Sequence, residues 1–124
     1  MNNPKEKLKD FFEKNGIVEL SKVTGLSYID IIDKLDLNFK TFKDIIFNSI
    51  HDGVFGRIMF ENGYGASVVS HSFSYGGEKG LYELAVLDKF GELTYDTTIT
   101  DNVIGHLTPE EVSEKLIEIQ DLKN

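Results

Sequence analysis

Residues 57–95 constrain the fold more than any other stretch, because they contain the signals of two consecutive β-hairpins. Asn62-Gly63 lies between two strand-like runs, and this dipeptide favours a two-residue type I′ turn since both residues tolerate a positive φ. Such a turn would place Phe60 opposite Gly65. The stretch therefore predicts a small antiparallel sheet.

The second hairpin signal begins with the strand-like run 81–87 and returns through residues 93–95. Gly91 suits the left-handed position of a three-residue loop, where glycine has no steric penalty. Both faces of 81–87 are largely apolar, which predicts a central strand that is covered on both sides. The next segment, 96–106, is short of apolar periodicity and is expected to cross the sheet. Its anchors are Ile99, Val103 and Ile104.

Composition restricts the chemistry that the chain can perform. The sequence contains no cysteine, which excludes disulfides, thiolate zinc sites and a cysteine nucleophile. The formal net charge of −8 opposes binding to a phosphate backbone, because the basic side chains are not clustered. No apolar stretch approaches the roughly 20 residues that span a bilayer, and the N-terminus lacks a signal-peptide pattern. These features predict a soluble protein without a membrane partner.

Residues 1–53 are predicted to be mainly helical. Proline in the first position of a helix indicates a start at Pro4, and a first helix is expected to end near Lys14, just before Gly16. Phenylalanine and isoleucine recur at helical spacing over residues 38–50, which predicts another helix there.

Residues 17–35 resemble a helix-turn-helix. The pattern comprises a first helix with Val18, Leu20 and Val23, a turn at Gly25, a cap at Ser27 and a second helix with Ile31 and Leu35. The resemblance implies that the second helix enters the DNA major groove. However, its outward face carries Asp30 and Asp33, and carboxylates are poor readers of phosphate or guanine. We therefore expect no direct binding to duplex DNA and a protein contact through Asp30 and Asp33.

The clearest helix start lies near the C-terminal end of the chain. Thr108 is the cap, Pro109 takes the first helical position, and Glu111 completes a capping box. The sequence as a whole predicts an α+β fold in one domain, residues 1–124. An N-terminal helical subregion (1–53) is expected to pack with a small antiparallel β-meander and a C-terminal helix (54–124).

Motifs of catalytic or metal-binding chemistry are missing from the sequence. His51, His71 and His106 lack the short spacing of helical zinc ligands, although the fold could still unite two of them. The serines around His71 are not part of a GxSxG elbow, and the glycine-rich runs lack the lysine and hydroxyl of a P-loop. We expect no catalytic residue, no metal and no cofactor, and therefore a protein that is not an enzyme.

The segment 70–80, SHSFSYGGEKG, is the best candidate for a contact surface. It combines hydroxyls, an imidazole, two aromatic rings and flexible glycine backbone, which is typical of recognition loops. A hairpin connection without a function is the plain alternative. The residues expected to contact a partner or ligand in this segment are His71, Phe73, Ser74 and Tyr75.

The strings NGYGASVV, SYGG, GLYELAVL, LTYDTTIT and VIGHLTPEEV lie within residues 57–122. They resemble a domain of small accessory proteins of tailed bacteriophages, most of which have no assigned activity. The resemblance implies a phage or prophage origin and action in the cytoplasm of the bacterial host, including anti-CRISPR or other anti-defence action. We expect a non-enzymatic inhibitor that binds a basic surface of a host defence protein. The alternatives are a sponge for a small nucleotide signal and a helix-turn-helix transcriptional regulator, and homodimerisation is left open.

Overall fold

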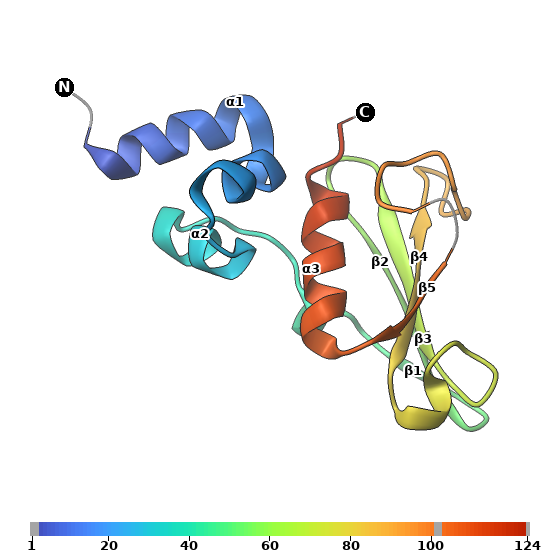
Figure 1. Cartoon of the computed structure of the whole chain (residues 1–124). Coiled ribbons are helices and arrows are strands. Elements are labelled where there is room, and N and C mark those ends of the chain that lie inside the picture. The colour runs from blue at the N-terminus through green and yellow to red at the C-terminus, as the bar shows by residue number, and fades with distance from the viewer. Residues whose placement is uncertain (1–2, 101–102, 124) are drawn as a thin grey trace. The chain divides into compact units, whose positions relative to one another are not determined.

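A computed structural model describes residues 3–100 and 103–123 of the chain (Figure 1). The chain divides into two compact units, Met1–Phe39 and Lys40–Asn124. The first unit is helical, and the second contains an antiparallel sheet with a helix packed on it. This confirms the α+β class. Residues 40–53, which the sequence pattern groups with the helices, cluster with the sheet.

The N-terminal unit consists of α1 (Pro4–Thr24) and α2 (Tyr28–Leu35). Gly16 has φ 87° and ψ 171°, which kinks α1 at the predicted end of the first helix. Gly25, with φ 74°, ends α1. The Ser27 hydroxyl then caps α2 by accepting a hydrogen bond from the backbone N–H of Asp30 at 3.1 Å. The two helices and the turn predicted for residues 17–35 are confirmed.

One apolar stripe of this unit is buried and consists of Ile17, Leu20, Ile31 and Leu35. Val23, which belongs to the helix-turn-helix pattern, is 62% exposed. The rings of Phe12 and Phe39 meet edge to face with centroids 6.2 Å apart. Aromatic pairs prefer this arrangement.

The second unit is built on a five-stranded antiparallel meander in the order β1-β2-β3-β4-β5. Its elements are the 3-10 turn η1 (Phe42–Asp44), β1 (Asn48–Ile50), β2 (Gly53–Met59), β3 (Gly65–Ser70), η2 (Gly77–Lys79), β4 (Tyr82–Leu87), β5 (Ile104–Leu107) and α3 (Pro109–Gln120). Figure 1 shows α3 lying against the sheet. The core of the unit lies between them, where Val68 and Leu84 from the sheet cluster with Val112, Leu116 and Ile119 from α3.

The helix predicted over residues 38–50 is wrong. The structure has a single 3-10 turn there, followed by β1, which pairs with β2. The phenylalanines that suggested a helical stripe instead meet a strand residue, since the rings of Phe42 and Phe47 both contact Tyr82, with centroids 5.1 and 5.7 Å away. Aromatic and β-branched residues have modest helix propensity and favour sheets, so pairing with β2 outweighs the local pattern.

The turn between β2 and β3 also differs from the prediction. Phe60 N–H donates to the carbonyl of Tyr64 at 2.8 Å, and Gly63 N–H donates to the carbonyl of Phe60 at 3.0 Å. The loop therefore has three residues, with Gly63 alone in the left-handed region at φ 92°. Gly65 pairs with Met59 instead of Phe60. This one-residue shift exchanges the two faces of β3 relative to β2, so that Ala66 and Val68 share the core face with Ile58 and Phe60.

The three-residue loop predicted after β4 is confirmed. Asp88 N–H donates to the carbonyl of Glu92 at 2.7 Å, and Gly91 has φ 78°. The returning segment forms only an isolated bridge between Leu87 and Leu93. β5 provides the second neighbour of β4, so the segment expected to cross the sheet ends in an edge strand.

Candidate functional site

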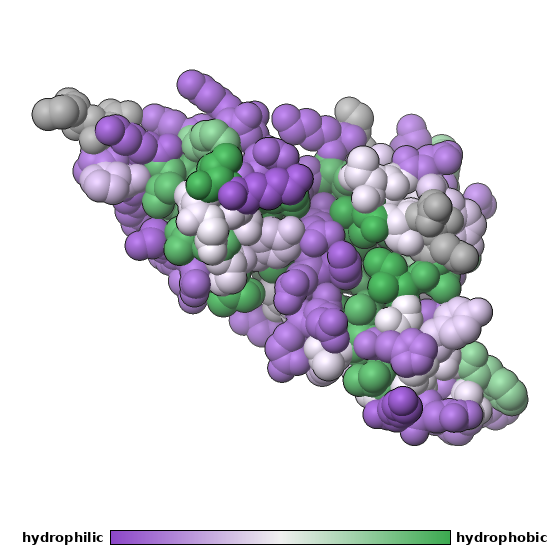
Figure 2. All heavy atoms as spheres, in the orientation of Figure 1, coloured by the Kyte–Doolittle hydropathy of each residue, from purple (hydrophilic) through white to green (hydrophobic). Residues whose placement is uncertain are grey.

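The strand register brings two distant segments together at one end of the sheet. Val54 pairs with Ser70, so the turn that precedes Val54 lies beside the loop that follows Ser70. We call the end of the sheet formed by residues 50–52 and 71–80 the tip; both segments lie at the lower right of Figure 1. In Figure 2 this end carries hydrophobic residues directly beside hydrophilic ones.

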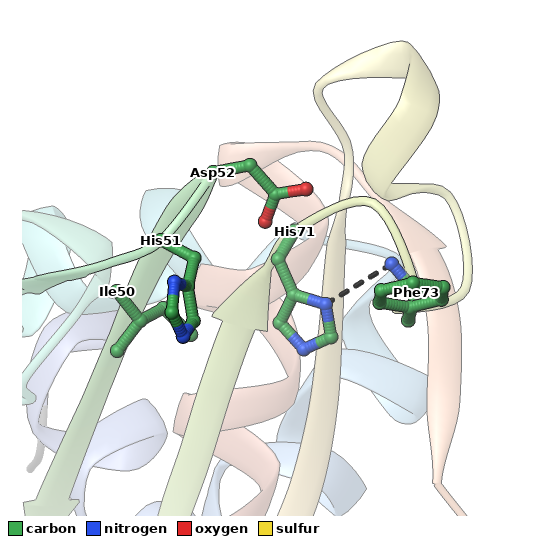
Figure 3. A pocket seen from close by; sticks show the side chains of 5 residues that line it. All are labelled: Ile50, His51, Asp52, His71 and Phe73. Carbon is green, nitrogen blue, oxygen red and sulfur yellow. Dashed lines mark hydrogen bonds between the residues drawn. The ribbon is translucent and has the colours of Figure 1, made fainter.

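A pocket of about 470 Å³ opens at the tip. It is lined by Ile50, His51, Asp52, His71 and Phe73 (Figure 3). Ile50 ends β1, His51 and Asp52 form the β1–β2 turn, and His71 and Phe73 belong to the loop after β3. Two of the three histidines therefore meet in one place, whereas His106 lies on β5.

Ser74 holds the 71–80 loop closed. Its hydroxyl accepts a hydrogen bond from the backbone N–H of His71 and donates one to the carbonyl of His71, both at 2.9 Å. The Ser74 residue is only 8% exposed. Among the residues predicted to contact a partner, Ser74 therefore shapes the loop and is not part of its surface.

Tyr75 anchors the loop to the sheet through its backbone. Its N–H donates to the Glu83 carboxylate at 3.1 Å, and its carbonyl accepts from the backbone N–H of His106 at 3.0 Å. A Cβ on Gly105 would collide with the Cβ of Tyr75, so the two backbones approach closely. The loop thus has fixed partners on β4 and β5.

Two aromatic side chains project from this braced loop. Phe73 is 93% exposed and Tyr75 is 63% exposed. The backbone N–H of Phe73 donates to Nδ1 of His71 at 3.1 Å, which ties the position of Phe73 to the imidazole (Figure 3). Of the predicted contact residues in the loop, His71, Phe73 and Tyr75 remain available at the tip.

Asp52 supplies the negative charge of the pocket. A hydrogen bond from the Ser72 side chain is the main cause that lowers the pKa of the Asp52 carboxyl, with smaller contributions from backbone N–H groups and from His71. Burial acts in the opposite direction but is outweighed. In Figure 3 Asp52 extends from the β1–β2 turn toward the strand end that carries His71. The carboxyl is therefore ionised at neutral pH.

The pocket combines two imidazoles, one carboxylate, one aromatic ring and one aliphatic side chain. In residues 3–100 and 103–123, no group of three histidine, aspartate or glutamate side chains is placed to hold a metal ion. Within the same ranges, no helix has an apolar stretch long enough to cross a bilayer.

Asp30 and Asp33 lie in the helical unit, on α2. Both are exposed, as predicted for the outward face of this helix. With Leu26 and Lys34 they line an open depression of about 500 Å³. This is a second candidate surface, with the two carboxylates as its charged groups.

Comparison of the chain with protein-family models, curated proteins and solved structures finds no significant match. The resemblance to phage accessory proteins stays a prediction.

The sequence pattern missed His51 and Asp52, because it assigned them to the end of a helix. The tripeptide His51-Asp52-Gly53 does signal a turn, but only the pairing of β2 with β3 brings that turn to His71.

Proposed function

We propose that the chain is a non-enzymatic binding protein that contacts its partner through the tip. The observation that carries this proposal is the 93% exposure of Phe73 on a loop held by hydrogen bonds to β4 and β5. A phenylalanine ring in water leaves its apolar surface uncovered, so a partner that buries the ring gains from the contact.

The energetic argument rests on preorganisation. Binding hot spots are enriched in large aromatic side chains, and truncating one typically costs 2 kcal/mol or more. Loops that are already ordered lose little conformational entropy on binding. Phe73 and Tyr75 meet both conditions, because the Ser74 and Glu83 hydrogen bonds define the loop before any partner arrives.

The partner that fits the charge of the chain is a protein with a basic surface. The net charge of −8 favours encounter with a positive patch and disfavours phosphate backbones. The phage-like strings favour a bacterial defence protein as the target, so that binding would act as inhibition in the cytoplasm of the host.

The test begins with affinity capture from a bacterial lysate and continues with titration of the purified partner. Phe73→Ala together with Tyr75→Ala should weaken binding by roughly a thousandfold, as expected for the loss of two aromatic anchors at about 2 kcal/mol each. Phe90→Ala is the matched control, because Phe90 is 77% exposed but follows the opposite end of β4. Equal affinity of the parent and the double variant, or loss only in the Phe90 variant, would contradict the proposal.

A nucleotide sponge is the second candidate, favoured by the rings of His71 and Phe73 in one pocket, on which a base can stack. The Asp52 carboxylate opposes the phosphate of such a ligand. Thermal stabilisation of the chain by millimolar cyclic or linear nucleotides would favour this alternative over protein binding.

A further inference from the structure

We propose that the pocket formed by His51, Asp52, His71 and Phe73 receives an arginine side chain of the protein partner. This inference rests on the proposed function, because it names the chemical group that the tip recognises. The general proposal of a protein contact assigns a role to the aromatic anchors but none to the pocket beside them. The present inference assigns that role.

The charge of the pocket favours a cation. Asp52 is the acidic residue that lines it, and the hydrogen bond from the Ser72 side chain lowers the pKa of its carboxyl. The Nδ1 of His71 accepts a hydrogen bond from the backbone N–H of Phe73 at 3.1 Å, which holds the imidazole beside the Phe73 backbone. An anionic occupant would instead meet the Asp52 carboxylate in a chain whose net charge is −8.

The shape of the lining favours arginine over lysine. The planar guanidinium stacks on flat rings and forms paired hydrogen bonds with a carboxylate, whereas the lysine ammonium is a compact, strongly hydrated charge. The pocket presents flat rings from His71 and Phe73 and a carboxylate from Asp52 (Figure 3). The centroids of the two rings are 6.5 Å apart, and the ring planes are inclined by 58°. Phe73 is exposed enough to lie against a cation from the partner.

The first experiment follows amide shifts of the full ¹⁵N-labelled chain by NMR. The probe is the peptide acetyl-Gly-Arg-Gly-amide, and the control is the same peptide with citrulline, which keeps the planar shape without the charge. The arginine peptide should shift the amides of residues 50–52 and 71–73 in a saturable way. Equal shifts from the citrulline peptide, shifts that map elsewhere, or the same shifts from inorganic phosphate would overturn the proposal.

Asp52→Asn is the decisive variant, since asparagine keeps an acceptor for Ser72 but removes the charge. This substitution should lower the affinity for the arginine peptide by about tenfold or more, because charge-assisted hydrogen bonds are lost. Asp88→Asn, in the loop after β4, is the control for loss of one negative charge and should leave the affinity unchanged. Unchanged affinity of Asp52→Asn in a folded chain would exclude the carboxylate as the arginine receptor.

The captured partner separates this inference from the proposed function. If Phe73→Ala with Tyr75→Ala abolishes partner binding but Asp52→Asn does not, the tip is the contact surface and the arginine pocket is wrong. If the arginine peptide binds through Asp52 but no tip variant affects the partner, the pocket is right and the proposed function is wrong.

Discussion

Asn62 connects the β2–β3 loop to the end of α3 through both ends of its side-chain amide. Its Nδ2 donates to the carbonyls of Ile119 and Leu122 at 2.8 and 3.0 Å, and its Oδ1 accepts from the backbone N–H of Tyr64 at 3.1 Å. Helix ends leave carbonyls without helical partners, so this side chain satisfies groups of α3 that would otherwise need water. One residue thus fixes both the loop conformation and the helix end.

Asn62→Asp should destabilise the sheet unit by about 1–3 kcal/mol. The carboxylate keeps an acceptor for Tyr64 N–H but places negative charge against two carbonyls at the negative end of a helix dipole. Chemical denaturation measures the effect. Asn48→Asp, at an exposed position of β1 in the same unit, is the control and should change stability by less than about 0.5 kcal/mol. A loss no larger than that of the control would show that the two carbonyl contacts are unimportant.

Gly63→Val should also destabilise the unit, by about 1–3 kcal/mol, because a β-branched residue is strained at the φ of 92° observed here. Gly63→Asn is the matched variant, since asparagine tolerates a positive φ better than valine does. The loss of stability in Gly63→Asn should be clearly smaller. Thermal unfolding followed by circular dichroism compares the two. Equal melting temperatures of the parent and Gly63→Val would refute the left-handed assignment.

At the scale of elements, α3 begins with a complete capping box. The Thr108 hydroxyl accepts from the Glu111 backbone N–H at 3.2 Å, and the Glu111 carboxylate accepts from the Thr108 backbone N–H at 3.0 Å. The hydrogen bond from the Thr108 backbone is the main cause that lowers the pKa of Glu111 below its ordinary 4.5, and the Thr108 side chain adds to it. The stability that the capping box gives to the start of α3 therefore depends on pH.

The sign of this coupling follows from the lowered pKa. The Glu111 carboxylate stabilises the folded chain above the ordinary value of 4.5, and this contribution is lost as the pH falls through the lower, folded value. Glu111→Gln removes the titrating group, so the stability difference between the parent and this variant should shrink with acidification. Urea unfolding between about pH 3 and pH 7 measures it. Glu110→Gln removes the same charge from the same turn and serves as the control; a constant difference for Glu111→Gln would contradict the prediction.

At the scale of the whole molecule, charge governs how partners are encountered. The net charge of −8 lies mainly on residues 40–124, which carry −7, whereas residues 1–39 carry −1. Asp30 and Asp33 form an exposed acidic pair on α2. Charges outside the buried centre of an interface act mainly on the association rate, while buried anchors act on dissociation. The carboxylates of α2 should therefore affect the association rate constant, and the aromatic rings of the tip should affect the dissociation rate constant.

Asp30→Lys with Asp33→Lys should slow association with a basic partner by about tenfold at low salt, because the net charge changes from −8 to −4. Each substitution removes one negative charge and adds one positive charge. Surface plasmon resonance at low and high salt measures the effect, which should fade as salt screens the field. Tyr75→Ala should instead speed dissociation. Identical association rates for the parent and the double variant at low salt would exclude a steering role.

The same double variant tests the helix-turn-helix alternative. With Asp30 and Asp33 on the outward face of α2, we expect the parent chain not to bind duplex DNA at physiological salt. Binding tighter than about 10⁻⁶ M would exceed the usual non-specific range and would favour the regulator. The charge-reversed variant then shows whether α2 is the surface involved.

The sequence by itself determined the features that depend on interactions within a few residues. The turn at Gly25 with the Ser27 cap, the loop at Gly91, and the capping box at Thr108 all occur as predicted. In each case a backbone conformation or a hydrogen bond involves side chains no more than a few positions away. The α+β class followed from the same local signals, because hairpins and capped helices occupy different parts of the chain.

Only the tertiary structure decided the rest, because long-range contacts outweigh weak local preferences. Residues 38–50 have a helical stripe, but Phe42–Asp44 form a 3-10 turn and Asn48–Ile50 form β1 next to β2. The β2–β3 loop extends to three residues, where Asn62 reaches the end of α3. The candidate site has the same origin. His51 and His71 are 20 positions apart, and their approach depends on the pairing of Val54 with Ser70, a register that no local pattern encodes.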